Sequence, residues 1–250
     1  MAKETTYYGL IEDLEKYLKY QRAEGVERLE VDRAVLEDLA KEPELEASKE
    51  VVVEASTIPN DFETLEAIAS HISSCTNCGL SQARTHTVPG EGNRDAPDIL
   101  FVGEGPGAEE DVLGRPFVGK AGQLLTKMIE AMGYQREEVF IANVVKCRPP
   151  ENRKPAREEM EQCLPFLRQQ IKLIQPQIIV GLGGTAIEGL LGNKVAITRM
   201  RGIWQEYEGI KLMPTFHPSY LLRDPSKKKE VWRDLKLVLA ELGKEPPPRK

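Results

Sequence analysis

The stretch ILFVGEGPGAEEDVLGRPFVGKAGQLL, residues 99–125, decides the fold of this chain. Its first four residues are apolar and predict a buried strand, and apolar residues recur at helical spacing from Ala121 to Met132. Gly133 is a natural end for that helix. The glycine-rich residues between strand and helix form a long connecting loop. Such a loop lies at the carboxyl end of a parallel strand, where open α/β sheets bind their ligands.

The glycines at 103, 105 and 107 are typical of part of a dinucleotide-binding fingerprint, but the details disagree. Pro106 removes a backbone N–H donor, the usual third glycine is missing, and Glu104 would face a pyrophosphate. The glycines do allow a ligand to approach the backbone closely. Acidic residues and Phe117 in the same loop indicate chemistry on a flat, polar molecule.

Further apolar runs predict three more strands, and helical patterns alternate with them. Strands are expected at residues 139–145, 177–182 and 211–216, and Pro214 suggests that the last of them is an edge strand. The helices are expected near residues 65–72, 120–132, 156–175, 185–191 and 226–242. The predicted fold is α/β, a three-layer α/β/α sandwich with a central four-stranded, mainly parallel sheet.

Charge divides the chain of 250 residues, which has a net charge of −6. Residues 1–60 hold 8 Lys and Arg against 15 Asp and Glu, a charge of −7, so residues 61–250 carry +1. We expect residues 1–60 to be an appended acidic segment, helical and partly disordered, before a domain at 61–245. A near-neutral domain binds DNA if its basic residues cluster on one face. The absence of a long apolar run or signal peptide predicts an intracellular protein.

The four cysteines are Cys75, Cys78, Cys147 and Cys163. Because no secretion signal precedes them, disulfide bonds are the poorer interpretation. One Cys-x-x-Cys pair and two distant cysteines suit a tetrahedral thiolate site for zinc or an iron-sulfur cluster, and the spacing does not choose between these metals. Buried free thiols are the structural alternative.

Two polar residues lie near the carboxyl ends of predicted strands. Asn143 interrupts the second apolar run and therefore needs hydrogen-bond partners. His217 follows the last strand and precedes Pro218 and Ser219. A buried asparagine is more often structural than functional. The position of both residues at the carboxyl edge of the sheet, with Glu104, favours a functional site.

Basic residues near this edge suggest contacts with phosphates. Arg148 and Arg153 belong to a basic, proline-rich loop. Arg84 lies in a polar loop and is expected to be a surface or phosphate-facing residue, not a catalytic one. The segment after His217 combines apolar side chains with a cation. We expect this segment to be exposed and able to open a base stack. Its residues are Tyr220, Leu221, Leu222 and Arg223.

These motifs resemble those of the family 4 uracil-DNA glycosylases, the iron-sulfur type found in many bacteria and archaea. The resemblance rests on GEGPG at 103–107, GRPFVG at 114–119, Asn143, the four spaced cysteines and HPS at 217–219. It covers about residues 62–242, which leaves the acidic segment outside it.

The resemblance implies how uracil would be read. Phe117 corresponds to the aromatic side chain that stacks on the flipped base, and Asn143 to the side chain that reads its Watson–Crick edge. The Asn143 carbonyl would accept from the ring N–H and its amide would donate to the neighbouring carbonyl oxygen, a pattern that cytosine reverses. Gly105 is assigned to uracil binding, and Glu110 to the ring edge that carries the methyl group of thymine.

The resemblance also implies the catalytic groups and the cofactor. Glu104 would position or activate water and steady the positive charge that develops on the sugar. His217 would contact the uracil carbonyl that gains negative charge. The four cysteines would hold a structural 4Fe-4S cluster near the DNA backbone. The residues assigned to DNA contacts are Arg84, Arg148, Arg153, Ser219, Tyr220, Leu221 and Arg223.

The predicted protein is a monofunctional DNA N-glycosylase, a hydrolase that flips deoxyuridine from double- or single-stranded DNA and leaves an abasic site for base excision repair. A related group becomes trapped covalently through a histidine that residues 147–163 lack, so simple hydrolysis is expected. The alternative is a cluster-containing DNA-binding or partner-binding module without turnover. We expect a monomer in the bacterial or archaeal cytoplasm, near the nucleoid and away from membranes, with contacts to other repair proteins assigned to residues 1–60.

Overall fold

The structure is a computed structural model that describes residues 61–248. The predicted acidic segment, residues 1–60, lies outside the described residues, so the predicted domain organisation stays a prediction. Among the helices of residues 61–248, none has the length and apolar character that crossing a membrane requires. The elements are, in chain order, α3 (Leu65–Ser74), β1 (Glu91–Gly92), β2 (Ile99–Gly103), α4 (Ala108–Leu113), α5 (Lys120–Ala131), β3 (Phe140–Asn143), α6 (Arg157–Ile174), β4 (Ile178–Leu182), α7 (Gly184–Leu191), α8 (Ile197–Met200), β5 (Gln205–Tyr207), β6 (Ile210–Thr215), α9 (Pro218–Arg223) and α10 (Lys228–Glu241).

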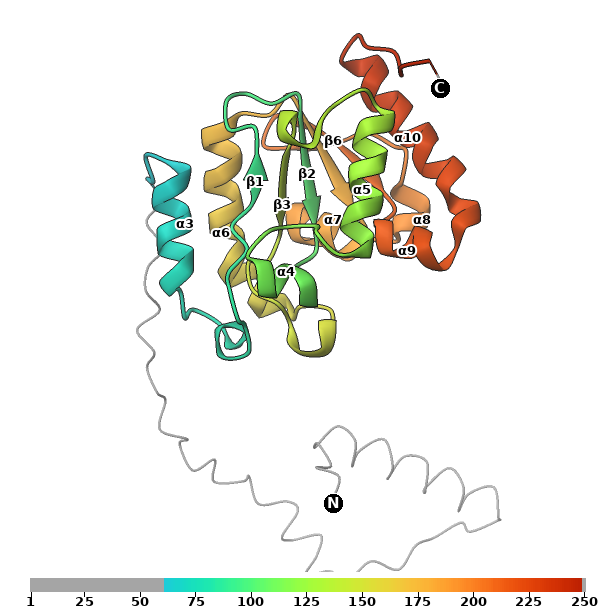
Figure 1. Ribbon diagram of the computed structural model, residues 1–250. Helices are drawn as coiled ribbons and strands as arrows, with labels where there is room; N and C mark the ends of the chain where they lie inside the picture. Colours follow the sequence, from blue (N-terminus) through green and yellow to red (C-terminus); the bar gives the residue numbers. More distant parts are fainter. Residues whose placement is uncertain (1–60, 249–250) are drawn as a thin grey trace, which may run out of the picture. The chain divides into compact units, whose positions relative to one another are not determined.

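One sheet of six strands forms the centre of the described chain (Figure 1). Its order is β1-β3-β2-β4-β6-β5. The four central strands are parallel and are the four that the apolar runs predicted, whereas β1 and β5 pair antiparallel at the two edges. Because β2, β3 and β4 are buried along their whole length, their sequences are nearly continuous apolar runs.

The prediction of four strands is wrong because both edge strands are too short to appear as apolar runs. The strand β1 has two residues and β5 has three. Pairing of β1 with β3 also brings Gly92 so close to the Val139 carbonyl that a Cβ atom would overlap it. The strand β1 therefore depends on a glycine and on its partner β3, and hydrophobic periodicity in the sequence does not reveal it.

Pro214 lies in β6, which is not the edge strand that we expected. The strand β4 pairs with β6 through Pro214, while β5 covers the other side only as far as Leu212. The Pro214 carbonyl accepts from the Gly202 N–H at 3.0 Å and therefore points away from β4. The missing proline N–H faces the side where β5 has already ended, so no ladder hydrogen bond is lost.

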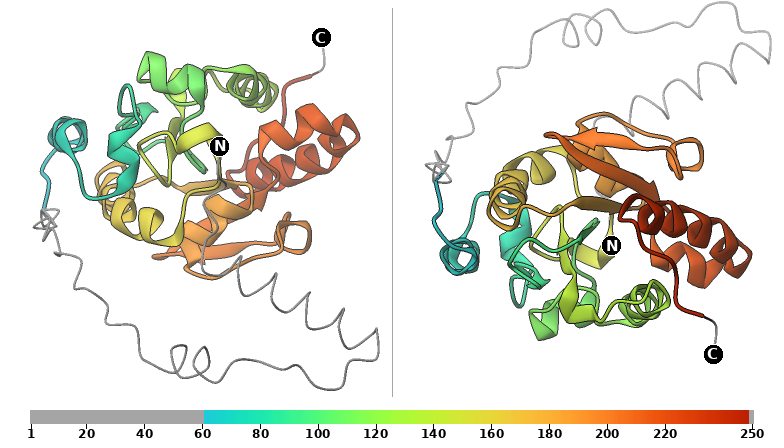
Figure 2. Two further views of the ribbon diagram at one scale, coloured as in Figure 1. Left: turned by 90° about the horizontal axis from the view of Figure 1, so that it is seen from below. Right: turned by 90° about the horizontal axis from the view of Figure 1, so that it is seen from above.

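Helices cover both faces of the sheet, which confirms the predicted three-layer α/β/α sandwich (Figures 1 and 2). On one face α3, α6 and α7 pack against strand residues such as Leu100 and Ile179. On the other face α5, α9 and α10 pack against Phe101, Val180 and Met213. Neighbouring residues of one strand thus belong to opposite layers, as the alternation of side chains along a strand requires.

The long loop after β2 contains a short helix, α4, that the sequence pattern did not predict. Acidic side chains in its first turn favour the helix start, and Gly114 ends it with a φ of 66°, a left-handed conformation that suits glycine. The buried Asp111 carboxylate accepts from the Thr85 N–H at 2.9 Å. This contact fastens the loop to the segment that follows the first two cysteines.

Phe101 is fully buried in β2 and belongs to the layer covered by α5 and α10. Replacing it by alanine should lower the free energy of unfolding by about 3–5 kcal/mol, because the missing ring leaves a cavity. Leu237→Ala is the control, since Leu237 is 43% exposed, and should change this free energy by no more than about 0.5 kcal/mol. Urea denaturation followed by circular dichroism compares them, and equal midpoints would contradict the described core.

Candidate active site

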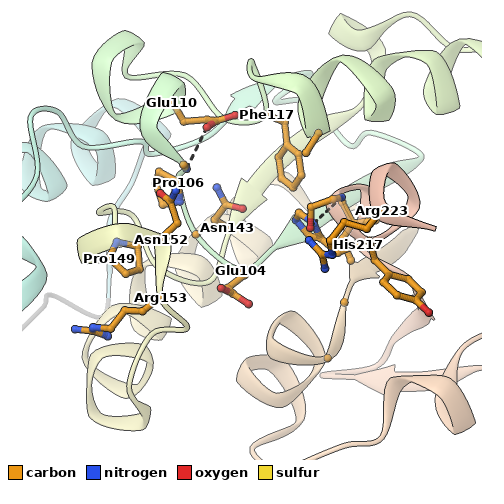
Figure 3. A pocket seen from close by; sticks show the side chains of 18 residues that line it. Glu104, Pro106, Glu110, Phe117, Asn143, Pro149, Asn152, Arg153, His217 and Arg223 are labelled. Atoms are coloured by element: carbon orange, nitrogen blue, oxygen red, sulfur yellow. Dashed lines mark hydrogen bonds between the residues drawn. The ribbon is translucent and has the colours of Figure 1, made fainter. Parts of the chain in front are cut away.

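A pocket of about 440 Å³ opens at the carboxyl ends of the parallel strands. Its walls come from the loop after β2, the end of β3, the loop before α6, the glycine turn after β4 and the start of α9. Figure 3 shows Glu104, Phe117, Asn143 and His217 around the same cavity. The volume and the place are those of ligand pockets in open α/β sheets. The fold therefore brings together the four residues that the sequence marked for chemistry.

The aromatic wall of the pocket is Phe117, which is 6% exposed. Its backbone has a φ of 50°, a left-handed value that is uncommon for residues other than glycine. Two glycines make room for it. A Cβ atom on Gly103 would lie 2.5 Å from the end of the ring, and one on Gly122 would overlap the Phe117 carbonyl. The ring lies 5.6 Å from the His217 ring, measured between centroids.

An ion pair behind the pocket holds the Phe117 segment in place. The Arg136 guanidinium donates to the Pro116 carbonyl at 2.5 Å and to Glu91 at 2.7 Å. Burial alone would raise the pKa of Glu91, but hydrogen bonds from Arg115 and Arg136 lower it below its usual value. No sequence pattern indicated Arg136, because it lies 20 residues beyond Pro116 in a polar turn.

Asn143 ends β3 and is 1% exposed. Its side-chain oxygen Oδ1 is buried and has no hydrogen-bond partner among residues 61–248. An unsatisfied buried acceptor costs about 1–3 kcal/mol, so it calls for an explanation. Because Asn143 lines the pocket, an N–H group of a bound ligand would supply the missing partner.

The hydrogen bonds of His217 decide which ring nitrogen carries the proton. Nδ1 accepts from the Ser219 backbone N–H at 3.1 Å and lies 2.8 Å from Ser219 Oγ. A backbone N–H can only donate, so the proton of the neutral ring is on Nε2. Burial of the ring, with a smaller contribution from the nearby Arg223 cation, lowers the pKa of His217 to about 4. At neutral pH the residue is an uncharged N–H donor.

The two carboxylates of the pocket differ in their hydrogen bonds. The Glu104 carboxylate has no protein partner among the described residues and is half-buried. Glu110 accepts from the N–H groups of Val118 and Gly119, both at 2.9 Å, and from that of Gly107 at 3.1 Å. We expected Glu110 at the edge of the base, but its geometry favours a role in holding the loop. Glu104 is left available to a ligand or to water.

The four cysteines line one small pocket, which we call the cysteine pocket. Cys147 and Cys163 are buried, and Cys75 and Cys78 are half-buried. Within residues 61–248, no three side chains of His, Cys, Asp or Glu are close enough to share one metal ion. Burial raises the pKa of the Cys163 thiol to about 12. Binding of a metal group at these sulfurs would therefore displace protons.

Arg84 points into this cysteine pocket. Its guanidinium donates to the Cys75 carbonyl at 2.7 Å and to Cys147 Sγ and the Ser73 carbonyl, both at 3.2 Å. Because its donors are engaged inside the protein, the geometry does not support the phosphate contact that we expected. A polar loop normally lies at the surface, and only the fold reveals that this one turns back over the cysteines.

The expectation that Leu221 is exposed is wrong, because its side chain is fully buried against the α5 and α10 layer. The segment forms the helix α9, so Leu221 faces inward while Leu222 is 46% exposed. Tyr220 and Arg223 do line the pocket, with the Arg223 cation 6.0 Å from the centre of the Tyr220 ring. Ser219, which we assigned to DNA, holds the His217 ring.

Two arginines of the loop before α6 lie near the same rim. Arg153 lines the pocket and pairs with Glu159 at 2.7 Å in an exposed position. Arg148 donates to Asn152 Oδ1 at 2.8 Å, and Asn152 also lines the pocket. Glu159 binds the Arg153 guanidinium through two hydrogen bonds, at 2.7 and 2.8 Å, so a phosphate would have to compete with this carboxylate.

The hydrogen bond from Ser219 predicts the titration of His217. Nitrogen-15 NMR should detect the Nε2–H tautomer at pH 7 and little protonation down to about pH 5, because the pKa of His217 is about 4. The unfolded chain takes up this proton near pH 6.5. The free energy of unfolding should therefore lose the His217 contribution as pH falls from 6.5 toward 4. Protonation near pH 6.5 in the folded protein would contradict the burial of this ring.

Comparisons with known proteins place the chain in a family. Residues 89–236 match the uracil DNA glycosylase superfamily. A type-4 uracil-DNA glycosylase of Thermotoga maritima is 49% identical over 187 residues, 73% of this chain and 97% of that protein. Its counterpart from Sulfurisphaera tokodaii is 46% identical over 71% of this chain and 84% of that protein. A DNA polymerase of Bacillus phage SP01 is 31% identical over 67% of this chain and 18% of the polymerase. The chain therefore belongs to the uracil DNA glycosylase superfamily and, within it, to the type-4 uracil-DNA glycosylases.

Proposed function

We propose that this protein removes uracil from DNA by hydrolysing the bond between base and sugar, which leaves an abasic site. Membership of the type-4 family supports the reaction. The observation that carries the assignment is the buried, unpartnered Oδ1 of Asn143 in a pocket with an aromatic wall. Deoxyuridine has to be flipped out of the duplex, because its glycosidic bond is unreachable inside the base stack.

Base recognition rests on Asn143 and Phe117. Asn143 Oδ1 accepts from the uracil ring N–H, and the side-chain amide donates to the neighbouring carbonyl oxygen. Cytosine offers an acceptor and a donor at these two atoms, so it would leave two buried polar groups unpaired. The Phe117 ring stacks on the flat face of the base, a contact that does not depend on the neighbouring DNA sequence.

His217 acts on the charge of the departing base. As the glycosidic bond breaks, a uracil carbonyl oxygen gains negative charge. The Nε2–H of neutral His217 donates a hydrogen bond to that oxygen, a type of contact worth about 2.7–4 kcal/mol at other preorganised sites. The Ser219 N–H bond keeps the ring in this tautomer.

Glu104 acts on the other side of the bond. Its carboxylate has no partner in the described part of the chain, and the residue follows β2 and lines the pocket. It orients a water molecule toward the sugar carbon, accepts a proton from that water, and steadies the positive charge that develops on the sugar. The products are uracil and an abasic site, with no covalent enzyme intermediate.

The DNA backbone is expected along the rim of the pocket, where Arg153 and Arg223 line it and Arg148 donates to the lining residue Asn152. Binding should weaken with salt in proportion to the number of phosphates contacted. Leu222 replaces Leu221 as the exposed apolar side chain of α9 that would enter the base stack. A monomeric state, a bacterial or archaeal cytoplasmic location and contacts through residues 1–60 remain predictions.

The cysteine pocket is assigned to a 4Fe-4S cluster. The support is that four thiols line one small pocket and that the chain belongs to the type-4 family. When bound, the cluster supplies a rigid cross-link between the loops that carry its ligands. Arg84 donates to Cys147 Sγ, an arrangement that stabilises a thiolate.

The central test is excision from oligonucleotides that contain a single uracil, with thymine and cytosine controls and alkaline cleavage as the readout. Wild type should cleave at uracil only. Asn143→Ala and Glu104→Ala should each lower the rate by about 100-fold or more, because each removes a group that acts on the reacting nucleotide. Asn193→Ala is a matched control in an exposed turn and should match the wild-type rate.

Two outcomes would contradict the proposal. Normal excision by Asn143→Ala would remove its role in recognition. An iron-loaded wild type that binds DNA but releases no uracil would replace the enzyme with a binding module.

The cluster assignment predicts the behaviour of Cys163→Ser. This variant should lose iron and the brown colour, and its melting temperature should fall, because the free energy of metal binding is part of the free energy of folding. Ser81→Ala, in the same pocket but without a thiol, should retain its iron. Iron analysis and visible absorption measure the cluster content of each variant. A colourless wild type that contains zinc would overturn the assignment.

A further inference from the structure

Lys146 carries a buried charge that the proposed reaction does not use. Its side chain is completely buried. The ammonium donates to the Asn143 carbonyl oxygen at 2.8 Å and to Gln170 Oε1 at 2.7 Å. No carboxylate of residues 61–248 pairs with it. Burial of an ammonium is costly, and the sulfur of Cys163, once ionised, would offset part of that cost.

The surroundings of Lys146 hold it in one position. Its backbone N–H lies 3.3 Å from Cys163 Sγ, and its carbonyl accepts from the Val88 N–H at 2.8 Å. Gln170, the second partner of the ammonium, donates to the Pro89 carbonyl at 2.7 Å. The end of β3, the helix α6 and the segment before β1 therefore meet at this lysine.

The contact with Asn143 bears on the direction of the Asn143 side chain. The ammonium reaches back three residues to the carbonyl that ends β3. The N–H of the same peptide group, that of Val144, donates to the Gly103 carbonyl at 2.9 Å. The peptide group is thus held at both its oxygen and its nitrogen, which sets the direction in which the Asn143 side chain leaves the backbone. Because Oδ1 has no hydrogen-bond partner among residues 61–248, the direction in which it points depends on this backbone.

We propose that Lys146 is a positioning residue for base recognition, which aims Asn143 at the uracil edge without touching the base. The inference rests on the function proposed above for Asn143. A lysine that only stabilised the fold would act differently, because its loss would weaken all DNA binding together. A positioning lysine affects the part of the affinity that comes from the base.

Two DNA probes separate these contributions. One oligonucleotide carries a single 2′-fluorinated deoxyuridine, which resists hydrolysis because fluorine disfavours a positively charged sugar. The other carries an abasic analogue at the same position. The ratio is the dissociation constant of the abasic probe divided by that of the fluorinated probe. Measured by fluorescence anisotropy on the full-length, iron-loaded protein, it reports the contribution of the base to affinity.

Lys146→Met keeps the length of the side chain and removes its hydrogen-bond donors. We expect the ratio to fall by about 10- to 100-fold, the cost of a small displacement of a recognition group, with unchanged affinity for the abasic probe. In the Asn143→Ala background the same substitution should add nothing. Lys172→Met is the matched control, because Lys172 is exposed on the same helix as Gln170, and should keep the wild-type ratio.

The outcomes distinguish the inference from the proposed function. A wild-type ratio in Lys146→Met, beside a reduced one in Asn143→Ala, would overturn the inference alone, and so would additive losses in the double variant. A wild type that binds both probes equally and excises no uracil would overturn the proposed function. If Lys146→Met does not fold, Gln170→Met releases the other anchor of the ammonium. A fall of this ratio in Gln170→Met, smaller than the one expected for Lys146→Met, supports the inference, and an unchanged ratio overturns it.

Discussion

The site depends on a close approach at the carboxyl end of β2. Gly103 has no side chain, and the space that a Cβ atom would take is filled by the Phe117 ring and the Asn143 side chain. In the proposed function one of these groups stacks on a flat ring while the other reads its edge, so both have to reach the same small volume. A strand that ends in glycine permits this, and the rest of the pocket is arranged around it.

Polar contacts behind the pocket hold its working groups. Arg136 holds the Phe117 segment, Lys146 the Asn143 peptide and Ser219 the His217 ring. Groups whose hydrogen bonds are already made do not reorganise when a ligand arrives, which is the basis of electrostatic preorganisation. Asn143 Oδ1 and the Glu104 carboxylate have no hydrogen-bond partner within residues 61–248, and to these groups we assign contacts with nucleotide and water.

The pocket and the cysteines share one stretch of chain. Residues 143–147 run from the recognition asparagine at the end of β3 to Cys147 of the cysteine pocket, and between them Lys146 contacts the Asn143 carbonyl through its ammonium and Cys163 Sγ through its backbone N–H. Two cations, Arg84 and Lys146, lie at the same cysteine pocket. Thiolates bound to a metal cluster would be compensated by these charges. A structural cofactor placed here would stiffen the segment from which Asn143 projects.

Local pattern was enough for the four central strands and for the place of Asn143 and His217, because apolar runs mark buried parallel strands and strand ends meet at one edge of the sheet. It failed where the outcome depended on the direction of a side chain or on a distant partner. Leu221 faces inward because α9 is helical, and Arg84 turns into the cysteine pocket because its loop folds back. The two short edge strands and Arg136 became visible only through their neighbours in space. The sequence alone determined the four central parallel strands and the polar residues that lie at their carboxyl ends, whereas the tertiary structure decided which of these groups have hydrogen-bond partners, because such partners are set by distance in space.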